Sequence, residues 1–379
     1  MSLEAEPNQQ IPLAQPEIGA REEELALEVL RSGRLSLGPM GERFERALAE
    51  WLGVEDAVAV SSGTTALHLG VRALGWGAGD EVLTSPFSFV ASANCLLYEG
   101  ARPVFCDVDP VTLNLDPEAA SAAAGERTRG ILPIHIFGFP AAMAELEALA
   151  ARHELGILED ACEAIGASDS EGHAAGARGN LATFAFYANK QMTTGEGGMI
   201  VPSGPEVAAR LRSERNQGRA VDMGWLDHDR LGFNYRLSDV QAAIGLAQVE
   251  KLPPLLERRA AVAAAYEERL AGVPGLAAPL ASRGQEVRSW FVYVVRLADE
   301  VDRDAVIRGL RDRGIDSKSY LPSVHLFPHI AALGYREGQF PVAEAAAAHS
   351  LALPFFPAMS EAQVDRVCRE LTAAIRSGR

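Results

Sequence analysis

The sequence has few cysteines, and nothing in their spacing pairs them. The four are scattered without a Cys-x-x-Cys pair, at Cys95, Cys106, Cys162 and Cys368. This spacing indicates neither a zinc knuckle nor a disulfide framework, so we expect no metal site of this kind. A chain with so few thiols suits a reducing compartment such as the cytoplasm.

Positive charge is also scarce, and long apolar runs are missing. The 35 Lys and Arg residues face 51 Asp and Glu residues, which gives a formal net charge of −16. Phosphate backbones demand clustered basic residues, so the composition argues against a nucleic-acid partner but leaves an anionic small ligand open.

No apolar run reaches the length of a membrane span. The first 19 residues have neither the basic start nor the apolar segment of a secretory signal. We therefore expect a cytoplasmic protein without a membrane partner.

What the chain does contain is typical of a globular enzyme. It has 379 residues, of which 48% are hydrophobic and 23% are charged. That length exceeds the usual size of one domain, so the sequence predicts one large domain and one smaller domain.

Short β-rich runs alternate with Ala- and Leu-rich helical stretches from about residue 57 to 203. This alternation predicts βα units in a mostly parallel sheet covered by helices, an α/β fold. The expected strands are "AVAVSS", "EVLTSP", "RPVFCDV", "GILPIHIFG", "LGILED", "LATFAFY" and "GMIVPS".

A change of pattern near residue 253 predicts a domain boundary. Ser238 and Gln241 form a capping-box start for a helix, and Pro253 and Pro254 close that helix. The sequence therefore predicts a large domain over residues 1–253, including an N-terminal arm. Residues 254–379, with their helices and the strand "SWFVYVVRL", predict a smaller α+β domain.

The stretch "FYANKQMTTGEGGMI" places a single lysine, Lys190, between a buried strand and a glycine-rich loop. A lysine at a strand end is most often a solvated surface charge. Apolar flanks and a small-residue loop instead favour a partly desolvated amine, which a nucleophilic or Schiff-base lysine requires.

A carboxylate and a phosphate cup accompany this lysine. The strand in "GILEDACEAIG" ends in Asp160, at the ligand-binding edge of the predicted sheet. Asp160 could serve only as a helix N-cap, but it also suits a protonated pyridine nitrogen. In "AVAVSSGTTALHL", a turn at Gly63 leads into a helix that starts with Thr64 and Thr65, where N–H groups and the helix dipole favour a phosphate. Lysine, carboxylate and cup together suggest pyridoxal phosphate.

An aromatic ring would complete this set by covering the face of the pyridine. Phe87 and Phe89 both follow a strand end in "SPFSFVASAN", and we expect one of them to belong to the core.

Nearly the whole chain resembles the nucleotide-sugar aminotransferases of the DegT/StrS type, which are fold-type I pyridoxal-phosphate enzymes. Nine segments in the order of that family carry the resemblance, and together they are very specific. They are "SGRLSLGP", "SSGTTALHL", "GDEVLTSPFSFVASAN", "ARPVFCDVD", "HIFG", "EDACEAIGA", "FYANKQMTTGEGGM", "LGFNYRLSDVQAAIGLAQ" and "LALPFFP".

The resemblance implies roles for individual residues. Lys190 matches the Schiff-base lysine, and Asp160 matches the partner of the pyridine nitrogen. Phe89, rather than Phe87, matches the ring that stacks on the cofactor. The remaining implied cofactor contacts are Gly63, Thr64 and Thr65 at the phosphate, Glu163 near the 3-hydroxyl, and Asn234, which reaches the phosphate of a neighbouring subunit. A homodimer with composite active sites follows from the last of these.

The chain departs from the family at one position. Ala185 replaces a serine that contacts the phosphate in many members, so one phosphate hydrogen bond is either missing or supplied by Asn189. Tyr320 and His325 resemble a segment near the sugar site, although His325 is nearly as well explained as a core histidine. Arg219 and Arg236 are candidate contacts for a diphosphate or ordinary ion-pair residues.

The implied activity is a ping-pong transamination from an amino acid, usually L-glutamate, to a nucleotide-linked 4-keto-6-deoxyhexose. Lys190 would be the proton shuttle. A sugar dehydratase of this family would carry histidine in place of Lys190. An enzyme for a keto-inositol or a 3-keto sugar stays open, as does a non-catalytic regulatory protein on the same scaffold.

Overall fold

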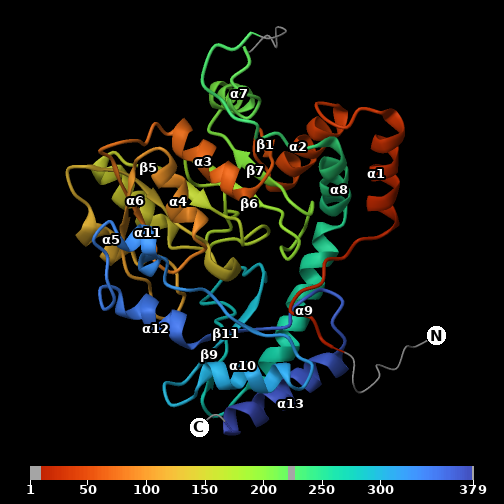
Figure 1. Ribbon diagram of the computed structural model, residues 1–379, viewed down its shortest axis with the longest axis vertical. Helices are drawn as coiled ribbons and strands as arrows, with labels where there is room; N and C mark the ends of the chain where they lie inside the picture. Colours follow the sequence, from red (N-terminus) through yellow and green to blue (C-terminus); the bar gives the residue numbers. More distant parts are fainter. Residues whose placement is uncertain (1–9, 221–226, 378–379) are drawn as a thin grey trace.

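Seven strands form the larger of two sheets in the computed structural model, which describes residues 10–220 and 227–377 (Figure 1). The strand order is β1-β7-β6-β5-β4-β2-β3, and only β7 runs against the others. The strands are β1 (Val58–Val60), β2 (Glu81–Thr84), β3 (Arg102–Phe105), β4 (Thr128–Leu132), β5 (Gly156–Asp160), β6 (Leu181–Ala185) and β7 (Gly198–Val201). Six of these strands lie in predicted runs, and β4 begins two residues before its predicted run. The mostly parallel α/β sheet is confirmed.

Helices cover both faces of this sheet, as the sequence predicted. Along β1, Val58 and Val60 pack into the apolar cluster that contains Leu67 of α3, whereas Ala59 packs into the cluster that contains Phe44 of α2. This alternation places successive side chains on opposite, buried faces. The helices are α1 (Ala20–Ser32), α2 (Pro39–Leu52), α3 (Gly63–Ala73), α4 (Ala91–Tyr98), α5 (Pro117–Ala123), α6 (Met143–His153), α7 (Pro205–Glu214) and α8 (Asp239–Glu250).

The second sheet is antiparallel and smaller, which confirms the expected α+β part. Its order is β10-β11-β9-β8. The strands are β8 (Leu276–Ala277), β9 (Tyr293–Leu297), β10 (Lys318–Ser319) and β11 (Ser350–Leu353). The helices of this part are α9 (Leu252–Leu270), α10 (Arg303–Arg311), α11 (Pro328–Ala331), α12 (Pro341–His349) and α13 (Glu361–Ser377).

The two prolines near residue 253 open a helix. The Ser238 hydroxyl accepts a hydrogen bond from the Gln241 N–H at 3.3 Å, so the predicted capping box starts α8. This helix ends at Glu250, and Pro253 and Pro254 lie in the first turn of α9, where a missing N–H costs nothing. In Figure 1, α8 and α9 follow one another from the larger sheet down to the smaller one. A division after residue 253 remains a prediction.

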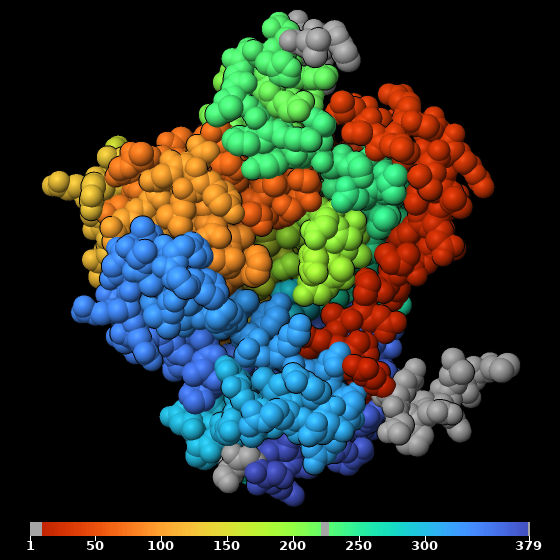
Figure 2. All heavy atoms as spheres, in the orientation of Figure 1, coloured from red at the N-terminus to blue at the C-terminus, as the bar shows by residue number. Residues whose placement is uncertain are grey.

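Packing between the two parts is extensive. In Figure 2, the segment from about residue 325 to 345 lies directly against the surface of the region around α4. Val324 and Ile330 share a buried cluster there with Ala93 and Phe105. Within the described ranges, no helix has both the length and the apolar character needed to cross a bilayer.

Candidate active site

A cavity of about 470 Å³ brings most of the predicted site residues together. It lies where β1, β2, β5 and β6 end, and residues 291, 320 and 321 from the C-terminal part close one side. This is the edge at which open α/β sheets bind ligands. The predicted residues that line it are Gly63, Thr64, Phe89, Asp160, Glu163, Asn189, Lys190 and Tyr320.

Lys190 projects into this cavity from the loop that follows β6. Its amide N–H donates to the Tyr187 carbonyl at 3.0 Å, and its side chain is only 13% exposed. The Nζ atom lies 3.6 Å from Oε1 of Glu163 and 4.0 Å from the centre of the Phe291 ring. The amine is thus partly desolvated, between a carboxyl group and the negative face of an aromatic ring.

Asp160, the last residue of β5, is 5% exposed. The Ser92 hydroxyl donates to Oδ2 at 2.7 Å, and the Cys162 amide donates to Oδ1 at 3.2 Å. No α-helix follows Asp160 directly in the described chain, so a helix cap does not explain it. Its partners are neutral, and a buried carboxylate with neutral partners is well suited to a cationic ligand atom.

The neighbouring carboxylate, Glu159, faces the other side of the sheet. It is fully buried, and His135 Nε2 lies 2.9 Å from its Oε2. The Ala141 amide donates to His135 Nδ1, so Nε2 carries the imidazole proton and donates it to Glu159. Burial raises the pKa of Glu159, but the hydrogen bonds from His135, Gly179 and Gly176 outweigh it, and the net pKa is lowered. Glu159 therefore stabilises the structure at this edge of the sheet through its hydrogen bonds, whereas Asp160 faces the cavity.

The start of α3 forms the predicted phosphate cup. Ser62 caps the helix by accepting from the Thr65 amide at 3.1 Å, and the Thr65 hydroxyl donates back to the Ser62 carbonyl at 2.8 Å. The Thr65 hydroxyl is therefore engaged in the cap, whereas Gly63 and Thr64 line the cavity. A Cβ atom on Gly63 would lie 2.6 Å from the Cβ atom of Ala185, so only glycine fits here without a shift.

Glu163 lies deep in the cavity, 7% exposed, and its Oε2 accepts from the Phe137 amide at 2.8 Å. Burial raises its pKa, and Lys190 opposes that increase without cancelling it. Tyr320 lines the same side, and burial raises the pKa of its phenol.

The aromatic residues divide as the sequence suggested. Phe87 is fully buried in the core, whereas Phe89 is 61% exposed and lines the cavity. Tyr187 and Phe291 also line it, and neither had been singled out. Tyr187 stood within the lysine motif, but no spacing signal pointed to Phe291, 101 positions beyond Lys190 in the chain.

Five predicted residues do not line the cavity, and Thr65 of the helix cap is one of them. Asn234 is exposed, and Arg236 donates to the Asn216 side chain at 2.9 Å. His325 is fully buried, with Nε2 3.1 Å from Glu344, so its packing matches the alternative of a core histidine. The backbone of Arg219 pairs with His228 in a β-bridge. Part of the expected specificity loop, residues 221–226, falls outside the described residues.

These residues fit pyridoxal phosphate. Gly63 and Thr64 line the cavity at the start of α3, where free N–H groups can bind a phosphate. Asp160 offers a carboxylate to a ring nitrogen, Phe89 offers a ring face, and Lys190 offers an amine.

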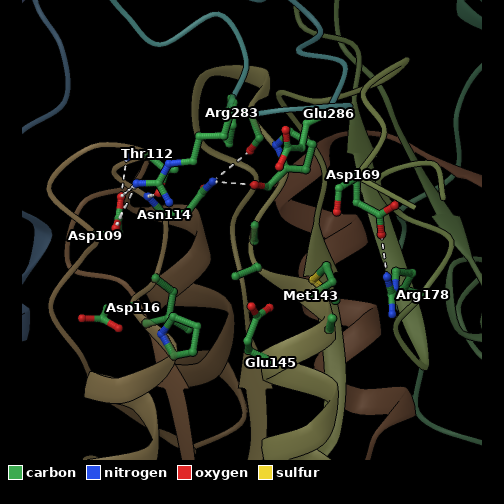
Figure 3. Close-up of a pocket in the computed structure, with 18 of the residues that line it drawn as sticks. Asp109, Thr112, Asn114, Asp116, Met143, Glu145, Asp169, Arg178, Arg283 and Glu286 are labelled. Atoms are coloured by element: carbon green, nitrogen blue, oxygen red, sulfur yellow. Dashed lines mark hydrogen bonds and ion pairs between the residues drawn. The ribbon is translucent and has the colours of Figure 1, made fainter. Parts of the chain in front are cut away.

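A second hollow, of about 330 Å³, lies away from this cavity, near the starts of α5 and α6 (Figure 3). Its labelled lining is mainly acidic, and Arg283 and Arg178 pair with Asp109 and Asp169 across it. Asp169 also belongs to a cluster with Glu171 and His173 whose spacing would allow a metal ion. Arg178 already supplies positive charge there, so the cluster does not require an ion.

Comparison with known proteins places the chain among aminotransferases. Residues 16–372 match the model of the DegT/DnrJ/EryC1/StrS aminotransferase family. The GDP-perosamine synthase of Caulobacter vibrioides is 38% identical over 372 residues, which cover 95% of this chain and 97% of that protein. A pleiotropic regulatory protein of Geobacillus stearothermophilus is 36% identical over 353 residues, with 92% and 93% covered.

Solved structures agree with these matches. The crystal structure of S. venezuelae DesV in complex with a ketimine intermediate superimposes with a TM-score of 0.90. The two chains are 36% identical, and the match covers 96% of this chain and 98% of the other.

Proposed function

Because this chain belongs to the DegT/DnrJ/EryC1/StrS aminotransferase family and is a pyridoxal-phosphate-dependent sugar aminotransferase, we propose that it aminates a nucleotide-linked 4-keto-6-deoxyhexose with L-glutamate as donor. The observation that carries the proposal is the convergence of Lys190 and Asp160 in one cavity beside the start of α3. Residues from four strand ends meet there.

The chain's own residues would hold the cofactor at three places. The N–H groups of Gly63 and Thr64 and the dipole of α3 bind the phosphate. Asp160 keeps a proton on the pyridine nitrogen, and Phe89 covers the ring. Pyridoxal phosphate, when bound, supplies an aldehyde that condenses with amines and a protonated ring that accepts the electron pair left at the donor's α-carbon.

Lys190 has two roles in this proposal. It would hold the cofactor through its side-chain amine until the amino donor binds. The free Nζ would then take the proton from the α-carbon of glutamate in the first half-reaction, and it would move a proton in the opposite sense when the keto-sugar reacts. Glu163, 3.6 Å away, holds Nζ in the cavity through both half-reactions.

The choice of acceptor is supported by the names of the relatives. One is a GDP-perosamine synthase, so a nucleotide-linked deoxysugar is the first acceptor to test. A keto-inositol or a 3-keto sugar is the alternative for the same site. Another relative has a regulatory name, but the presence of Lys190, Asp160 and Glu163 in one cavity of this chain supports catalysis.

We also propose a homodimer with composite sites. Phe89 and Tyr187 line the cavity yet are 61% and 51% exposed, so its rim presents aromatic surface. Asn234 is exposed and outside the cavity of its own chain, which suits a contact to the phosphate of a second subunit. Light scattering on a size-exclusion column tests the dimer, and a monomer with full activity would contradict it.

The experiment for the activity is the absorbance spectrum of the purified protein with pyridoxal phosphate, before and after L-glutamate. We expect a band that glutamate bleaches and that a Lys190→Ala variant does not form normally. Mass spectrometry should then show amination of a GDP- or dTDP-linked 4-keto-6-deoxyhexose. A protein that forms no band would contradict the cofactor and the activity, whereas a bleached enzyme that aminates only a keto-inositol would contradict the acceptor.

A further inference from the structure

Arg259 is an almost completely buried cation on α9, 3% exposed. Its Nη2 donates to the Lys190 carbonyl at 3.1 Å, and its Nη1 donates to the Phe291 carbonyl at 3.2 Å. The guanidinium carbon lies 5.6 Å from the centre of the Phe355 ring. The partners that the structure gives it are thus main-chain carbonyls and a ring, and not a carboxylate. Burial accordingly lowers the pKa of Arg259 to about 10.

Stability alone does not account for a guanidinium at this position. A buried charge without an opposite charge is costly, and an apolar side chain of similar volume is often at least as stable in such a place. What a guanidinium adds is geometry, because its planar fork binds two acceptors at fixed positions. An ammonium group is a point charge and lacks this fork.

The two carbonyls belong to the residues whose side chains meet in the cavity. The Nζ atom of Lys190 lies 4.0 Å from the centre of the Phe291 ring. Lys190 follows β6 of the larger sheet, whereas Phe291 precedes β9 of the smaller one. Arg259 therefore joins the backbones of two separate elements at the point where the reactive amine must be held.

A second side chain reinforces the same junction. Gln191, the next residue after Lys190, donates from Nε2 to the Glu163 carbonyl at 2.6 Å and to the Ser289 hydroxyl at 3.0 Å. Ser289 lies two positions before Phe291. Hydrogen bonds thus hold the lysine loop on both sides of the Lys190–Gln191 peptide.

We propose that Arg259 is a positioning residue that fixes Lys190 over the Phe291 ring by binding the main-chain carbonyls of both residues. The inference rests on the proposed function, in which Lys190 is the cofactor-binding amine. Its consequence is kinetic, because an attacking group misplaced by about 1 Å can react on the order of 100-fold more slowly.

The test compares Arg259→Met and Arg259→Lys with an Arg258→Met control. Arg258 is the preceding residue of the same helix, its side chain is 48% exposed, and it pairs with Glu17 at the surface. The measurement is the rate at which apoprotein mixed with pyridoxal phosphate forms the covalent lysine adduct. Absorbance follows the rate, and borohydride trapping with peptide mass spectrometry assigns the adduct to Lys190.

We expect Arg259→Met to form the adduct about 10- to 100-fold more slowly than the wild type. Its melting temperature should stay the same or rise, because an unpaired buried charge has been removed. Arg259→Lys should be slowed as well, since one ammonium cannot bridge both carbonyls as the fork does. Arg258→Met should match the wild type.

A second readout separates positioning from general loosening. In Arg259→Met, the Phe291 ring should no longer lie beside the Lys190 nitrogen and stabilise its protonated form. The pH midpoint of the adduct's absorbance should therefore be lower than in the wild type by about half a unit. Glu163, the charged group nearest Nζ, is unchanged in every variant.

The outcomes are distinct. If the wild type forms no adduct, the proposed function fails. If the wild type reacts and Arg259→Met reacts at the same rate and with the same midpoint, the role of Arg259 is overturned. If Arg259→Met does not fold, Arg259→Lys decides in the same way: a wild-type rate overturns the inference, and a slowed rate supports it.

Discussion

Glu163 is a buried carboxyl group whose surroundings act on its pKa in opposite directions. Burial raises the pKa most, and the positive charge of Lys190 lowers it, with a net increase. A raised pKa in the folded state means that folding is favoured most at low pH, where the carboxyl is protonated in both states. That contribution is lost as the pH rises from the ordinary glutamate pKa through the raised one.

We therefore predict that Glu163→Gln becomes more stable relative to the wild type as the pH rises through this window. The gain in the free energy of unfolding should appear between the ordinary glutamate pKa and the raised one, and should level off above that range. Urea unfolding of both cofactor-free proteins between pH 4 and pH 8 measures it. A difference that does not change with pH would contradict the raised pKa.

Ser92 supplies the side-chain hydrogen bond that the structure gives Asp160, at 2.7 Å. The Ser88 hydroxyl lies 2.9 Å from the Ser92 hydroxyl, so a short chain of buried hydroxyls ends on the carboxylate. Because hydrogen bonds to charged groups contribute about 1.5–3 kcal/mol, we predict that Ser92→Ala weakens cofactor binding about tenfold or more. Ser92→Thr should restore it.

The matched control is Ser85→Ala. Ser85 lies in the loop after β2 and, like Ser92, is buried. Its hydroxyl accepts from the Phe87 amide at 3.0 Å and is not bonded to Asp160. Its loss should lower the free energy of unfolding without lowering cofactor affinity. Equal affinities for the two alanine variants, measured by fluorescence titration, would show that Ser92 does not act through Asp160.

Among the elements, α3 begins close to β6 because its first residue, Gly63, has no side chain. At Gly63, an added Cβ atom would lie 2.6 Å from the Cβ of Ala185 and 3.2 Å from the sulfur of Cys162. Gly63→Ala must therefore push the start of α3 away from β6. We predict a loss of about 1–3 kcal/mol in stability and weaker cofactor binding.

Gly41, in α2, is the control for this change, because nothing lies within 4 Å of a Cβ atom built there. Gly41→Ala should stabilise the protein by roughly 0.5–1 kcal/mol, as alanine does in a helix interior. Thermal unfolding of both variants, with and without pyridoxal phosphate, makes the comparison. If both substitutions had the same effect, close packing at Gly63 would not position α3.

Sequence reasoning worked best where a local pattern decides the structure. The apolar run of β5 ends at Asp160 and so placed it at the sheet edge, and the capping box at Ser238 started α8 as expected. It could not find Phe291 or Arg259, because their approach to Lys190 depends on how two sheets pack. His325 was predicted from its resemblance to a family segment. Its burial beside Glu344 depends on tertiary contacts that the spacing of residues does not encode.

At the scale of the whole molecule, the two predicted domains share a core. Val294, Leu321 and Ala352 from the C-terminal part belong to the same buried cluster as Val60 and Leu158 of the larger sheet. The cavity is shared as well, since Phe291 and Tyr320 close it. Neither part can lose its structure without exposing apolar surface of the other.

We therefore predict that the chain unfolds in a single calorimetric transition, despite its length and its two sheets. The proposed cofactor site lies between the parts. Pyridoxal phosphate should therefore raise the temperature of that whole transition, with a stabilisation of about 2.7 kcal/mol at 100 times its Kd. Lys190→Ala, which leaves the shared core intact, should keep one transition and show a smaller shift. Two separate transitions, only one of them moved by the cofactor, would mean that residues 1–253 bind it without help from the C-terminal part.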